Sequence, residues 1–69
     1  MKNYCVSIVF IKKRLFKKNE IVNTVAIAGG LDRSEQAIQV VKETILDKNP
    51  KFKNYKIEIE SATEIPYGL

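Results

Sequence analysis

The chain has 69 residues, of which 45% are hydrophobic and 29% are charged, and its formal net charge at pH 7 is +4. This length supports one small hydrophobic core and excludes two independent domains. The apolar fraction is too high for an intrinsically disordered chain. The longest apolar stretch, residues 4–11, is far shorter than the ~18–20 residues that a membrane-spanning helix needs, so we expect neither a transmembrane segment nor a membrane partner.

Residues Tyr4–Ile11 predict the first strand, because β-branched and aromatic side chains fill most of these positions. Apolar side chains occur at both parities, which is typical of a central strand with contacts on its two faces. The next segment, Lys12–Glu20, places five cations around Leu15 and Phe16 and predicts a basic, exposed hairpin connection with a long or irregular turn.

Residues Ile21–Ala28 predict the second strand, because β-branched and small side chains again alternate. We expect Gly29 and Gly30 to end this strand in a sharp reversal, since residues without a β-carbon permit one. A plain turn is the better interpretation than a phosphate-binding loop, because the spacing matches no phosphate-binding motif and acidic residues follow.

A helix is predicted to begin near residue 33, with Asp32 and Glu35 forming a start that resembles a capping box and Ser34 as an alternative cap. Its apolar residues recur at spacings of three and four, which is typical of a helix that lies on a sheet. They are Ala37, Ile38, Val41, Thr44 and Ile45. We expect Asn49 and Pro50 to end the helix, because proline cannot continue its hydrogen bonds.

Tyr55, Ile57 and Ile59 alternate with charged residues and predict a last strand that is buried on one face. The segments together predict an α+β domain of ββαβ type, in which one helix covers one face of a three-stranded antiparallel sheet. The expected strand order is 2-1-3, because apolar side chains on both faces of the first strand place it at the centre of the sheet. We assign residues 1–65 to a single domain and 66–69 to a flexible C-terminal tail.

This topology brings the hairpin and the C-terminal end of the helix to the same end of the molecule. Eight cations, which we name the basic pole, are then concentrated there: Lys12, Lys13, Arg14, Lys17, Lys18, Lys48, Lys51 and Lys53. One interpretation is that these charges only complement the helix dipole and keep the protein in solution. The other is that they attract a polyanion, either an acidic protein surface or a nucleic-acid backbone.

One helix covers only one face of three strands, so the opposite face of the sheet stays open. If the even-numbered residues of the first strand face the helix, then Cys5, Val9 and Ile11 form an apolar patch with one parity of the second strand. A homodimer or another protein would bury this patch, although strand register and twist could also hide much of it. The edge of the second strand is a further place where a partner strand could pair.

The sequence argues against catalysis. Without a histidine, the chain cannot form a catalytic triad, a cysteine–histidine dyad or a histidine metal site. The single cysteine, Cys5, cannot make a zinc site or an internal disulfide, and it favours the cytoplasm as the compartment. Glu58 and Glu60 share the wet face of a strand, which is typical of a solvated surface. We expect no enzyme activity, metal or cofactor.

Three segments, KNYCVSIVFIKK, AGGLDRSEQAI and NYKIEIESATEIP, give a whole-chain pattern that resembles small strand-strand-helix-strand accessory proteins of phages and other mobile elements. The resemblance implies a non-catalytic protein that acts by binding, such as an inhibitor of a host complex, anti-CRISPR-type proteins among them. The leading hypothesis is therefore a protein–protein interaction module whose partner is an acidic protein surface or a nucleoprotein complex. The alternative is a sequence-independent nucleic-acid-binding protein that uses the basic pole. Few aromatic side chains are available to stack on bases, so base-specific recognition is the less favoured form of this alternative.

Overall fold

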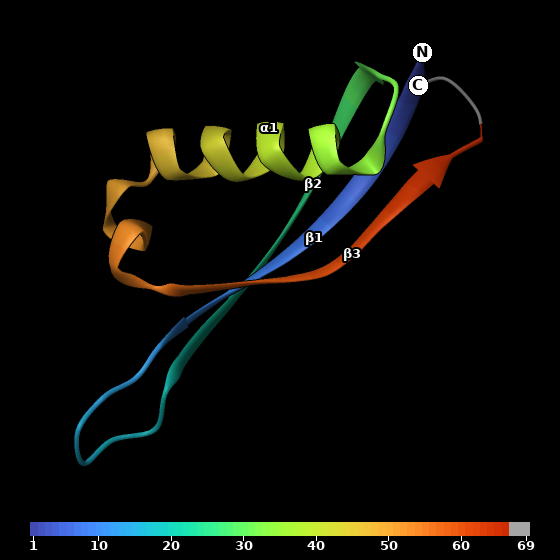
Figure 1. The fold of residues 1–69 in the computed structure, drawn as a ribbon. Coiled ribbons are helices and arrows are strands. Elements are labelled where there is room, and N and C mark those ends of the chain that lie inside the picture. The colour runs from blue at the N-terminus through green and yellow to red at the C-terminus, as the bar shows by residue number, and fades with distance from the viewer. Residues whose placement is uncertain (67–69) are drawn as a thin grey trace.

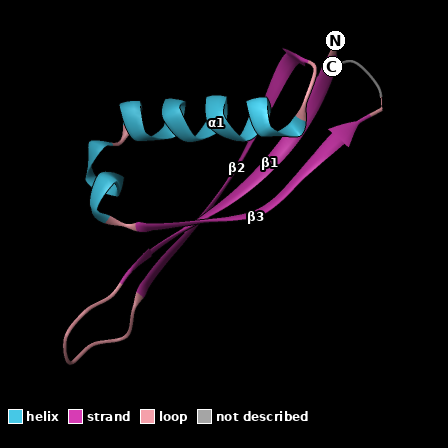
Figure 2. Ribbon diagram, in the orientation of Figure 1, coloured by secondary structure: helices cyan, strands magenta, loops and turns pink. Residues whose placement is uncertain are grey.

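The computed structural model describes residues 1–66, which form an open antiparallel sheet with one long helix on one face (Figures 1 and 2). The elements in chain order are β1 (Lys2–Lys12), β2 (Glu20–Leu31), α1 (Ser34–Lys48), the 3-10 helix η1 (Pro50–Asn54) and β3 (Lys56–Ile65). The strand order is β2-β1-β3, and β1 is antiparallel to both neighbours. The predicted ββαβ fold and strand order are confirmed. Residues 67–69 of the predicted tail lie outside the described residues.

The core lies between the sheet and α1. Its floor is the inner face of β1, where Tyr4, Val6, Ile8 and Phe10 are all buried. The sequence left open which face of this strand is buried, and the structure shows that it is the face of the even-numbered residues. The remaining core residues come from the other elements: Ala28, Ala37, Val41, Ile45, Phe52 and Tyr55. Each large apolar side chain that is fully buried contributes about 1.5–3 kcal/mol to folding, so β1 is the main source of stability for the sheet.

Phe52 joins the C-terminal end of the helix to the sheet. After α1 ends at Lys48, the chain turns through η1 and places the Phe52 ring parallel to Phe10, with centroids 4.5 Å apart and an interplanar angle of 16°. The Tyr55 ring meets Phe52 edge-on at 5.0 Å. This cluster holds η1 against the C-terminal half of β1.

The predicted end of the second strand is wrong, because β2 continues through Gly29 and Gly30 to Leu31. The pairing with β1 shifts register in this region, between Lys2 and Tyr4. The two glycines permit the irregularity: Gly30 has a φ of +75°, and a β-carbon at Gly29 would lie 2.5 Å from the Asn3 side-chain oxygen. They therefore serve a close strand contact and not a reversal.

The helix begins where the sequence predicts, but a different side chain binds its first backbone groups. Gln36 accepts hydrogen bonds at Oε1 from the backbone N–H groups of Asp32, at 3.0 Å, and Arg33, at 3.1 Å. Neither Glu35 nor Ser34 makes the predicted cap. Gln36 stands at the position where a capping box has glutamate or glutamine, and its side-chain oxygen reaches back to the N-cap backbone N–H of Arg33.

The buried face of α1 is narrower than the sequence predicts. Ala37, Val41 and Ile45 are buried against the sheet. Thr44, predicted to belong to this stripe, is exposed, and its hydroxyl donates a hydrogen bond to the Val40 backbone oxygen at 2.8 Å. The hydroxyl is thus satisfied within the helix and does not need a partner in the core.

The molecule is elongated, with extents of 46 × 19 × 18 Å, because the β1–β2 hairpin continues past the part of the sheet that α1 covers (Figure 1). Within residues 1–66, no helix is both long and apolar enough to cross a membrane.

Candidate binding surfaces

The loop between β1 and β2, residues 13–19, projects from the end of the molecule and is named the hairpin tip (Figure 2). All of its side chains are exposed. Leu15 and Phe16 at its centre are 85% and 103% exposed. Phe16 also has a φ of +64°, in the left-handed region that bulky residues rarely adopt. The tip therefore presents two large apolar side chains to solvent on a strained backbone.

Glu20 ties the base of this hairpin to the start of β3. Its Oε2 atom accepts one hydrogen bond from Arg14 Nη2 at 2.6 Å and another from the Tyr55 hydroxyl at 2.9 Å. The Arg14 hydrogen bond, and then the Tyr55 hydrogen bond, lower the pKa of the Glu20 carboxyl. Burial, followed by the bond to Glu20, raises the pKa of the Tyr55 hydroxyl. The hairpin thus leaves the body of the protein in a defined direction.

The eight residues of the basic pole are all exposed, and they lie in two groups. Five are in or next to the hairpin tip, and three are at the end of α1 and in η1. In the first group, Lys12 Nζ lies 5.7 Å from the centre of the Tyr55 ring, which follows η1. In the second group, Lys51 Nζ lies 5.2 Å from the centre of the Phe52 ring.

Most of the charge in the basic pole is uncompensated. Of its eight cations, Arg14 is the one that forms an ion pair among residues 1–66, with Glu20. The remaining lysines extend from the hairpin tip to η1 and give this end of the molecule a positive potential.

Leu15 and Phe16 are the candidate binding residues that the sequence interpretation missed. It treated them as part of a basic loop and assigned function only to the cations around them. The signal was present, since two adjacent bulky apolar residues in a lysine-rich turn have no neighbouring element to bury them.

On the open face of the sheet, β2 exposes more apolar surface than β1 does. The predicted interface residues Cys5, Val9 and Ile11 do lie on this face, but neighbouring side chains leave them only half-exposed. The exposed large apolar residues of this face are on β2, with Ile21 at 65%, Val25 at 59% and Ile27 at 51%.

A polar connection crosses the same face from one edge strand to the other. Asn23 Nδ2 donates to Glu60 Oε2 at 3.0 Å and lies 3.4 Å from the Ser7 hydroxyl oxygen. Ser7 is buried beneath it. This polar connection interrupts the apolar patch on the open face. The exposed apolar residues of the patch lie on β2, which is an edge strand.

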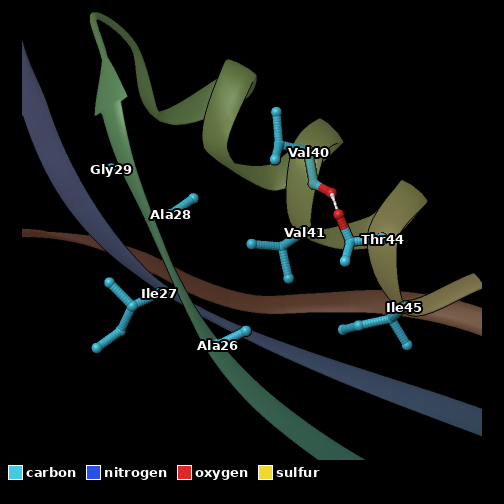
Figure 3. Close-up of a pocket in the computed structure, with 8 residues that line it drawn as sticks. All are labelled: Ala26, Ile27, Ala28, Gly29, Val40, Val41, Thr44 and Ile45. Atoms are coloured by element: carbon cyan, nitrogen blue, oxygen red, sulfur yellow. Dashed lines mark hydrogen bonds between the residues drawn. The ribbon is translucent and has the colours of Figure 1, made fainter. Parts of the chain in front are cut away.

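A shallow groove of about 160 Å³ runs between that edge and α1 (Figure 3). Ala26 and Ala28 point from β2 toward the helix, while Ile27 points away from it. The helix side includes Val40, which is 44% exposed. No charged residue lines the groove, so it is suited to apolar side chains and not to acid–base chemistry.

Across residues 1–66, no three or more His, Cys, Asp or Glu side chains are grouped so that they could hold a metal ion. No protein-family model, curated protein or solved structure matches the chain. The geometry of its surfaces is therefore the basis for a functional assignment.

Proposed function

We propose that this chain is a non-catalytic protein–protein interaction module that docks its basic pole on an acidic surface of a partner protein. The observation that carries the proposal is the hairpin tip, where Leu15 and Phe16 are exposed among lysines. The tip is the part that enters the interface.

The conformation of Phe16 supports a binding role. A left-handed φ on a phenylalanine costs of order 1–3 kcal/mol, and such strain persists mainly where function requires it. The ring also packs on no core residue, so folding does not explain its presence. Aromatic residues are enriched among the residues that dominate binding at the centre of protein interfaces, and polar residues form the rim around them.

The cations supply a different contribution. Their field attracts an acidic partner over distances of about a Debye length, ~8 Å at physiological ionic strength, and raises the association rate. Because Lys13, Lys17 and Lys18 flank the apolar pair, they orient the tip before Leu15 and Phe16 are buried. The charges thus govern association, and the apolar pair governs how long the complex lasts.

Sequence-independent nucleic-acid binding is the second candidate, and the exposed Phe16 ring favours it. Single-strand binding proteins combine cations that follow the backbone with aromatic rings on which bases stack. The sequence interpretation counted few free aromatics, but Phe16 is one. A single ring offers stacking for few bases, which is why an acidic protein surface is the preferred partner.

Affinity capture from nuclease-treated host lysate, followed by binding measurements with the purified partner, tests the proposal. The hairpin variant, Leu15→Ser with Phe16→Ser, should weaken binding by about 30-fold, which corresponds to about 2 kcal/mol. Neutralising Lys13, Lys17 and Lys18 to Gln should lower the association rate and its salt dependence.

The matched control neutralises Lys2, Arg33 and Lys42 to Gln, which removes the same charge away from the basic pole. It should bind as the wild-type protein does. Unchanged capture by the hairpin variant would refute the proposal. Tight binding to mixed-sequence DNA or RNA that falls steeply with salt would replace it with the second candidate. Inhibition of a host complex, which the resemblance to mobile-element proteins implies, remains a prediction within the same proposal.

A further inference from the structure

The two edges of the sheet differ in chemistry. One edge strand, β3, carries Lys56, Glu58, Glu60 and Glu64. Charged side chains are a usual protection of an edge strand against pairing with another chain. The pairing of each edge strand with β1 contains a register shift, so the two edges differ in their charge. The other edge strand, β2, has no charged residue and no proline between Ile21 and Leu31.

The unprotected edge has apolar surface on both of its sides. On the open face it exposes Ile21, Val25 and Ile27. On the helix face it borders the neutral groove beneath Val40 (Figure 3). A strand added to this edge would lie about 4.8 Å from β2 and would place alternate side chains in the groove and against the exposed apolar row.

The sequence of β2 is complementary to itself in size. In antiparallel self-pairing centred on Val25, bulky residues of one copy lie opposite small ones of the other at most positions. The resulting pairs are Ile21 with Gly29, Val22 with Ala28, Asn23 with Ile27, and Thr24 with Ala26. Val22 and Thr24 are on the helix face, so they would lie at the end of the groove that Ala26 and Ala28 line in the other copy.

Charge permits the pairing with a second copy. At the centre of the self-pairing Val25 faces Val25 of the other copy, so a charge there would meet a like charge, but residues 21–31 carry none. An antiparallel arrangement also directs the two basic poles to opposite ends of the dimer, where their mutual repulsion is smallest.

We propose that two copies of this chain pair through their β2 edges, antiparallel and centred on Val25, to form one continuous sheet with both helices on the same face. The pairing joins two identical surfaces and closes as a two-fold dimer. It goes beyond the interaction proposed for the hairpin tip, and it gives one assembly two such tips that point in opposite directions.

Analytical ultracentrifugation over a range of concentrations tests the pairing. We expect the wild-type chain to dimerise and Val25→Lys to weaken dimerisation by tenfold or more, because two lysines would meet at the two-fold axis. The matched control is Ser61→Lys on the other edge strand, since Val25 and Ser61 both lie opposite Ser7. This control should dimerise normally.

A charge-swap experiment separates pairing from a general loss of structure. Mixing Val25→Lys with Val25→Glu should restore a dimer that neither variant forms well alone. Amide hydrogen exchange of the wild-type protein should show protection along β2 that increases with protein concentration.

A wild-type chain that stays monomeric at high concentration would overturn the proposal, even if another protein were found to pair with β2. Equal disruption by Ser61→Lys, or a dimer whose β2 amides gain no protection with concentration, would overturn it as well. None of these results depends on whether the hairpin tip binds a partner.

Discussion

Phe16 and Phe52 have similar neighbours in the sequence and opposite positions in the structure. Each lies next to lysine in a short segment that joins regular elements. Phe52 is 6% exposed and stacks on Phe10, whereas Phe16 is fully exposed. The difference arises because η1 folds back over the end of β1, while the hairpin tip extends past every other element (Figure 1). The path of the chain, and not the local sequence, decides which phenylalanine becomes core.

The largest expected effect is the difference in unfolding free energy between variants that truncate Phe52 and Phe16. Phe52→Ala removes a buried ring and should lower the free energy of unfolding by about 3–5 kcal/mol, as measured by urea denaturation. Phe16→Ala should change it by no more than about 0.5–1 kcal/mol, since no contact is lost and some backbone strain remains. Similar losses from the two variants would show that the hairpin tip packs on the body in solution.

The pH dependence of stability should reveal the link between the hairpin base and the aromatic cluster. The pKa of Glu20 is lowered in the folded state, so its contribution to stability is complete above about 4.5, its ordinary value, and is lost as pH falls through the lowered pKa. The pKa of Tyr55 is raised, so its contribution is complete below about 10, its ordinary value, and is lost as pH rises through the raised pKa.

Urea midpoints measured from pH 2 to pH 7, ~0.5 unit apart, should therefore fall less steeply with acid in Glu20→Gln than in the wild-type protein. Glu43→Gln, on the exposed side of α1, is the control and should keep the wild-type slope. An unaltered acid slope in Glu20→Gln would show that this carboxylate does not hold the hairpin.

The smallest expected effect is a gain in stability at the tip. Asparagine tolerates the left-handed region better than phenylalanine, so Phe16→Asn should raise the free energy of unfolding by up to about 1 kcal/mol. Leu15→Asn should give no such gain, because Phe16 is the non-glycine residue with positive φ among residues 1–66. If Phe16→Asn is more stable but no longer binds the partner, the strained backbone at Phe16 is kept for binding. If Phe16→Asn is less stable than the wild-type protein, the backbone at Phe16 is not strained.

The fold was predictable because each strand and the helix have a clear local pattern. The apolar run of β1 identified the central strand, and the buried residues of α1, Ala37, Val41 and Ile45, recur every four residues within the predicted stripe. Two features were not predictable from local pattern. In the sequence, Gly29 and Gly30 have the pattern of a turn. The structure shows that the Asn3 side chain approaches Gly29 closely, and local sequence could not reveal this because Asn3 is distant in the chain. Phe52 is buried only because Phe10 lies beneath it.

The candidate surfaces were predictable in part. The exposure of the eight cations in the basic pole could be expected from the sequence, because lysines in connections are exposed in almost any fold. The sequence did not identify Leu15 and Phe16, since the exposure of an apolar residue depends on what the rest of the chain leaves uncovered. The difference in charge between the β2 and β3 edges likewise depends on the strand order, which places these two strands at the edges of the sheet.

Because the hairpin tip lies outside the core, the residues proposed for binding are separate from the residues that stabilise the fold. The β1–β2 ladder closes at the pair Lys12 and Glu20, and no core residue lies beyond it. Doubling the length of a flexible loop costs only about 0.6 kcal/mol in closure entropy. Insertions and substitutions in residues 15–19, beyond the Arg14–Glu20 ion pair, should therefore cost the fold little. Under the proposed function, such changes would give related chains new targets on an unchanged scaffold.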